Sequence, residues 1–144
     1  MMDNDSVRLL RECNAGIKMG VSSIDEILEN VSDSKMKQIL KESRQEHCKL
    51  EKEMEEYLEE CKEPEKEPAV MAKAMSWIKT NMKMAMKDSD KTVADLITDG
   101  CNMGIKAVYR YLNQYPAAEN KIKNLAEKLA HIEEKLVKDM RVYL

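Results

Sequence analysis

The apolar residues of this chain recur every three or four positions almost from end to end. That spacing is the period of one face of an α-helix, whereas a half-buried strand alternates every second residue. The chain has no Phe and few runs of β-branched residues, which further argues against an all-β fold. The pattern therefore predicts an all-α protein, and 144 residues suit a single helical-bundle domain over 1–144.

Breaks in this pattern divide the chain into five expected helices. Asp5 or Ser6 can cap the first helix, and Asp33 or Ser34 can cap the second. Pro116 suits the first turn of the last helix, where its missing N–H has no intrahelical partner to lose. We expect helices over residues 6–31, 34–61, 69–87, 91–113 and 116–143.

The four glycines indicate how these helices are arranged. They form two pairs spaced four residues apart, each pair inside one long helix. If the 69–87 segment carries the chain back along the bundle, counting from the turns places Gly16 level with Gly104 and Gly20 level with Gly100. Small residues let helix backbones approach closely. We therefore expect two antiparallel hairpins joined by a long crossover that contains an additional helix, with close helix packing at these glycines.

This hairpin, crossover, hairpin order resembles the ferritin-like superfamily along the whole chain. The stretches MSWIKTN (75–81) and DGCNMG (99–104) resemble small uncharacterised bacterial proteins of that architecture. The resemblance implies a four-helix bundle. In the carboxylate proteins of the superfamily, two helices each supply a Glu and the other two each supply a Glu-x-x-His to a metal centre. The match here is incomplete, because Arg44 stands three positions before His47 and because His131 falls on the polar face of the last helix.

A smaller polar cluster is expected at the middle of the bundle. The same counting places Asp99 near Ser43 and Glu133, with His47 one turn away. One interpretation is a hydrogen-bonded polar network inside the core, since buried polar groups usually find partners. The other is a degenerate ferritin-like site in which His47, Asp99 and Glu133 bind a single Fe, Mn or Zn ion.

The 69–87 segment suggests an association surface. Its helical face is rich in Met, and Trp77 lies at the edge of that face beside lysines. Met and Trp are frequent at protein interfaces. We expect a homodimer, or binding of a protein partner, through Met71, Met75, Trp77, Ile78 and Met82.

Composition and motifs narrow the function further. There are 24 Lys and Arg against 27 Asp and Glu, a net charge of −3, so no basic surface for nucleic acid is expected. No apolar run is long enough to span a membrane, no signal peptide opens the chain, and none of the four Cys forms a Cys-x-x-Cys pair. These features predict a cytoplasmic protein with free thiols. There is no Gly-rich phosphate loop and there are only two His, so we expect a non-enzymatic bundle without a cofactor that acts by association. The alternative is the single-ion metal-binding protein.

Overall fold

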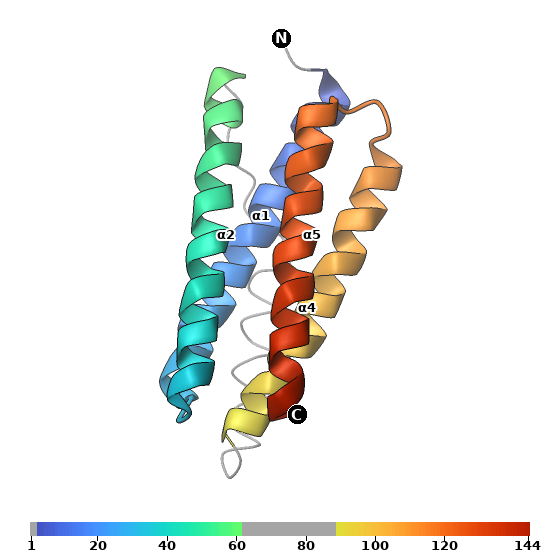
Figure 1. Cartoon of the computed structure of the whole chain (residues 1–144). Coiled ribbons are helices and arrows are strands. Elements are labelled where there is room, and N and C mark those ends of the chain that lie inside the picture. Colours follow the sequence, from blue (N-terminus) through green and yellow to red (C-terminus); the bar gives the residue numbers. More distant parts are fainter. Residues whose placement is uncertain (1–2, 62–88) are drawn as a thin grey trace.

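A computed structural model describes residues 3–61 and 89–144 of the chain (Figure 1). Helix α1 spans Asn4–Ile27 and is followed by a short 3-10 helix, η1, at Leu28–Asn30. Helix α2 spans Ser34–Glu60, α4 spans Ser89–Gln114 and α5 spans Asn120–Met140, with a 3-10 helix, η2, at Arg141–Tyr143. The all-α prediction and the four long helices are confirmed. The predicted additional helix at 69–87 lies outside the described residues.

One of the predicted helix starts is confirmed, and two helices start at other residues than predicted. The carboxylate of Asp33 accepts a hydrogen bond from the N–H of Met36 at 2.8 Å and caps α2, as predicted. The cap of α1 is Asp3, whose carboxylate accepts from the N–H of Ser6 at 2.7 Å, so the prediction of Asp5 or Ser6 was wrong. Helix α5 begins at Asn120, four residues after the predicted start at Pro116.

The turn before α5 is attached to the start of α1. The N–H of Ala117 donates to the carboxylate of Asp5 at 3.0 Å, and the N–H of Glu119 donates to the hydroxyl of Ser6 at 2.7 Å. These backbone groups therefore tie the α4–α5 turn to the start of α1.

The four helices form an antiparallel bundle in which α4 runs parallel to α2 and antiparallel to α1 (Figure 1). At the other end, the backbone N–H groups of Ser32 and Asp33 donate to the carboxylate of Asp90 at 2.7 and 3.0 Å, which joins the α1–α2 turn to the start of α4. Each helix packs on two neighbours around the bundle, α1 and α5 also touch across it, and the predicted topology of the two hairpins is confirmed.

Two apolar clusters fill the interior, one in each half of the bundle. We call them the upper and lower clusters, following Figure 1, with the upper one beside the α4–α5 turn. The buried members of the upper cluster are Leu9, Leu10, Cys13, Ile17, Leu50, Met54, Leu58, Val108, Ala118, Ile122, Leu125, Ala126, Leu129 and Ala130. The buried members of the lower cluster are Ile24, Ile27, Val31, Met36, Leu40, Val93, Ala94, Ile97, Cys101, Leu136 and Met140.

Candidate functional site

A polar layer lies between the two apolar clusters. On each of the four long helices, a glycine or a polar residue lies between the residues of the upper cluster and those of the lower cluster. We call this set the central layer, and its members are Gly20 on α1, Ser43 and His47 on α2, Gly104 on α4 and Glu133 on α5. Because polar groups are costly to bury without partners, such a layer in the middle of a core is the best candidate for a function.

His47 is held in one orientation by its own helix. Its side chain is 2% exposed, and its Nδ1 lies 2.7 Å from the carbonyl oxygen of Ser43. A carbonyl can only accept a hydrogen bond, so Nδ1 carries the hydrogen and Nε2 carries the lone pair. Burial lowers the pKa of His47, against smaller opposing effects of the Ser43 hydrogen bond and of Glu46. The imidazole is therefore neutral at pH 7.

Glu133 is the most unusual side chain of the layer. It is 7% exposed, and its Oε2 has no hydrogen-bond partner among the described residues. Burial raises the pKa of Glu133 to about 8, so the carboxyl group is mostly protonated at pH 7. No hydrogen bond joins it to His47 in the structure, although both side chains are described. The layer therefore contains a neutral acid and a neutral base at pH 7.

Each of these two side chains lies against a glycine of a neighbouring helix. A Cβ atom at Gly20 would lie 3.3 Å from Cδ2 of His47. A Cβ atom at Gly104 would lie 2.6 Å from Oε1 of Glu133, closer than real Cβ contacts occur. The missing Cβ at these positions thus provides the room that the two polar side chains occupy.

This corrects the predicted pairing of the glycines. Neither Gly16 nor Gly100 has an atom of another described helix within 4 Å of its Cβ position, and Gly100 is exposed. Gly20 contacts α2 and Gly104 contacts α5, so the four glycines do not bring α1 and α4 together face to face. The topology was right although the packing that suggested it was not.

The structure places the three predicted metal ligands differently. His47 and Glu133 are buried in the central layer, whereas Asp99 is exposed. The described ranges 3–61 and 89–144 hold no group of three or more His, Cys, Asp or Glu side chains that could bind a metal ion. The three residues are therefore not brought together.

The position of Asp99 follows from the face that α4 buries. The predicted cluster placed Asp99 inside the bundle, but Asp99 is exposed, and so is Met103 one turn further along, which is 67% exposed. The stripe that faces the core instead contains Ile97, Cys101 and Val108. Burying this stripe leaves the Asp99 carboxylate in water, which avoids a large desolvation cost.

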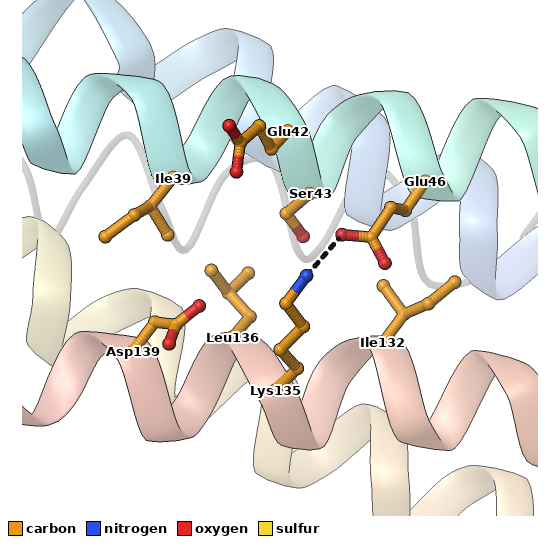
Figure 2. Close-up of a pocket in the computed structure, with 8 residues that line it drawn as sticks. All are labelled: Ile39, Glu42, Ser43, Glu46, Ile132, Lys135, Leu136 and Asp139. Atoms are coloured by element: carbon orange, nitrogen blue, oxygen red, sulfur yellow. Dashed lines mark hydrogen bonds and ion pairs between the residues drawn. The ribbon is translucent and has the colours of Figure 1, made fainter.

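A surface groove between α2 and α5 leads to the layer from outside (Figure 2). Its lining residues are Ile39, Glu42, Ser43, Glu46, Ile132, Lys135, Leu136 and Asp139. An ion pair between Nζ of Lys135 and Oε1 of Glu46, 3.0 Å apart, spans it. Ser43 lies in this groove and also holds His47, so it is the contact between the groove and the layer. This groove was not predicted, because the sequence signals it by no more than opposite charges on two helices.

The four thiols are free, as predicted. Cys13 and Cys101 are buried, and Cys48 and Cys61 are partly exposed. Burial, together with nearby glutamates, raises the pKa of Cys13 to about 12 and raises that of Cys101 as well. The two buried thiols therefore stay protonated and behave as small apolar groups.

The predicted interface at Met71, Met75, Trp77, Ile78 and Met82 lies outside the described residues. Within the described ranges, no helix combines the length and the apolar character that crossing a bilayer requires.

Together the fold and this site define an all-α four-helix bundle with a polar layer between two apolar cores. No protein-family model matches the chain, and no curated protein matches it. Among solved structures, the chain is similar to a DUF305 fragment from Deinococcus radiodurans, with a TM-score of 0.78 and 11% sequence identity over 98% of this chain and 95% of that one. At this identity the likeness shows the fold alone.

Proposed function

We propose that this protein is a non-enzymatic, cytoplasmic helical bundle that acts through association, first of all with a second copy of itself. The proposal rests on two large apolar side chains that α4 exposes on its outer surface. Met103 is 67% exposed there and Tyr109 is 43% exposed, next to Lys106 and Arg110. Apolar side chains that gather on a surface often mark an interface, and these two lie six positions apart on α4 with the exposed Lys106 between them.

The sequence suggests a second surface for the same function, around Trp77 and Met75, which lies outside the described residues. Two surfaces can be tested in parallel. The first variant is Met103→Lys with Tyr109→Lys, and the second is Trp77→Ala with Met75→Ala. Val142→Lys is the matched control, because Val142 is 81% exposed and lies at the C-terminal end of the chain.

Sedimentation velocity at about 5 to 200 µM measures the association directly. We expect the wild-type protein and the control to sediment as a dimer at the higher concentrations, and at least one double variant to sediment as a monomer with an unchanged helical circular dichroism spectrum. Wild-type protein that stays monomeric throughout would contradict self-association. A dimer that resists both double variants would contradict these surfaces.

The alternative, a single metal ion in the bundle, lacks a comparable observation. Of its three expected ligands only His47 and Glu133 lie in the central layer.

A further inference from the structure

The central layer can be compared with the metal centre that the ferritin-like resemblance implies. That centre needs a Glu from each of two helices and a Glu-x-x-His from each of the other two. In this chain the layer residues of α1 and α4 are Gly20 and Gly104, which have no side chain to donate. At these two positions α1 and α4 therefore lack the Glu that the centre needs.

The other two helices each keep only half of the motif. On α2, His47 is present but Arg44 stands three positions before it, and the Arg44 guanidinium pairs with the Asp25 carboxylate at the surface. On α5, Glu133 is present but Leu136 stands three positions after it and is buried in the lower cluster. One imidazole and one carboxyl group remain from the six side chains of the full set.

The space that further metal ligands would need is also filled. Side chains on α1 and α4 would have to start from the Cβ positions of Gly20 and Gly104. Those positions lie 3.3 Å from the His47 ring and 2.8 Å from Cδ of Glu133. The two remaining polar side chains thus occupy the volume through which ligands from the facing helices would reach the centre.

The two polar groups that remain do not make a metal centre. His47 keeps a lone pair on Nε2, but a single imidazole is short of the three or four ligands that such a centre needs. Glu133 is 7% exposed, and its Oε2 has no partner among the described residues. Within those residues no basic side chain is hydrogen-bonded to it.

We propose that the central layer is a metal-independent packing layer, in which His47 and Glu133 fill the space left by Gly20 and Gly104 and join the two apolar cores without an ion. The layer then stabilises the bundle through the way its side chains fit against the neighbouring helices. Glu133 needs glycine at position 104, and His47 is held by the carbonyl of Ser43.

Two measurements on the full-length protein, purified without a His-tag, test this. The first is elemental analysis and thermal unfolding after dialysis against Fe²⁺, Mn²⁺ or Zn²⁺, or against EDTA. We expect less than about 0.1 ion per chain and midpoints that agree within about 1 °C, because a ligand that binds only the folded state would raise the midpoint. One ion per chain that is lost in Glu133→Ala or His47→Ala would overturn the proposal.

The second measurement compares glycine positions on the same helix. Gly100→Ala is the control, because its Cβ meets no described atom and alanine is the better helix former. We expect this control to raise the midpoint by about 2–5 °C and Gly104→Ala to lie several degrees below it. In a Glu133→Ala background, Gly104→Ala should instead be as favourable as the control substitution. Equal midpoints for Gly104→Ala and Gly100→Ala in the wild-type background would overturn the proposal, since Glu133 would then not need the glycine.

Discussion

The buried carboxyl group of Glu133 makes the stability of this protein depend on pH in a direction that can be calculated. Its pKa is about 8 in the folded protein, against 4.5 for the ordinary side chain. Between these two values the folded state keeps a proton that the unfolded state loses. The free energy of unfolding therefore falls as the pH rises, by about 1.4 kcal/mol for each pH unit and by about 5 kcal/mol in total. Below pH 4.5 and above pH 8 this group adds no further slope.

The substitution Glu133→Gln isolates this effect. Glutamine has nearly the same shape as protonated glutamate and does not titrate. We expect the variant and the wild type to be similarly stable near pH 5, and the variant to be more stable by about 3 kcal/mol or more at pH 8. That difference is a large part of the total stability of a typical domain.

Urea unfolding followed by circular dichroism at pH 5, 6, 7, 8 and 9 measures the difference between the two proteins. Groups common to both cancel, including His47, whose lowered pKa adds stability that is lost as the pH falls below 6.5. Glu134→Gln is the control, because Glu134 is exposed and pairs with His131 at 3.4 Å, and we expect it to change stability by less than about 1 kcal/mol. A difference between Glu133→Gln and wild type that stays constant from pH 5 to 9 would refute the reasoning, because Glu133 would then titrate as an ordinary glutamate.

Two further expectations rest on other contacts. In a urea titration, Asp90→Ala should lower the free energy of unfolding by about 1–3 kcal/mol, because two backbone N–H groups of the α1–α2 turn lose their charged acceptor. Asp95 is exposed on the same helix, so the control Asp95→Ala should lower it by less than about 0.5 kcal/mol. An aromatic disulfide reagent should modify the partly exposed thiols of Cys48 and Cys61 quickly in the native protein, and the buried thiols of Cys13 and Cys101 only at the rate of unfolding. Mass spectrometry identifies which thiols have reacted. Equal losses from both aspartates, or four thiols that react alike, would contradict these assignments.

Much of the fold could be predicted from local patterns. The apolar period of 3.6 residues predicts helices directly, and the short break before Asp33 makes α1 and α2 antiparallel neighbours. The cap at Asp33 was predicted because its carboxylate needs only the N–H of Met36, three residues away. These features depend on neighbours in sequence. The parallel course of α2 and α4 was predicted from the level of the glycine pairs, and it is correct although that glycine packing does not occur.

The faces and partners of the helices required the tertiary structure. The apolar residues of α4 fall on two neighbouring stripes of the helix surface. These stripes are separated by less than the rotation of one residue about the helix axis, so the apolar period does not show which stripe faces the core. Packing against α5 decides for the stripe with Cys101 and Gly104, which exposes Met103 and Asp99.

The central layer shows the same division between sequence and structure. His47 was predicted inside the bundle because it lies among apolar residues at helical spacing, and Glu133 was placed near it by counting residues from the turns. That each would fill the space beside a glycine of another helix could not be predicted, because that contact depends on helix rotation and on the distance between helix axes. The sequence pattern alone placed His47 inside the bundle. The packing of the four helices decided that Asp99 and Met103 are exposed and that His47 and Glu133 each meet a glycine, because a shift of one Cβ position is enough to open or close the space for a side chain.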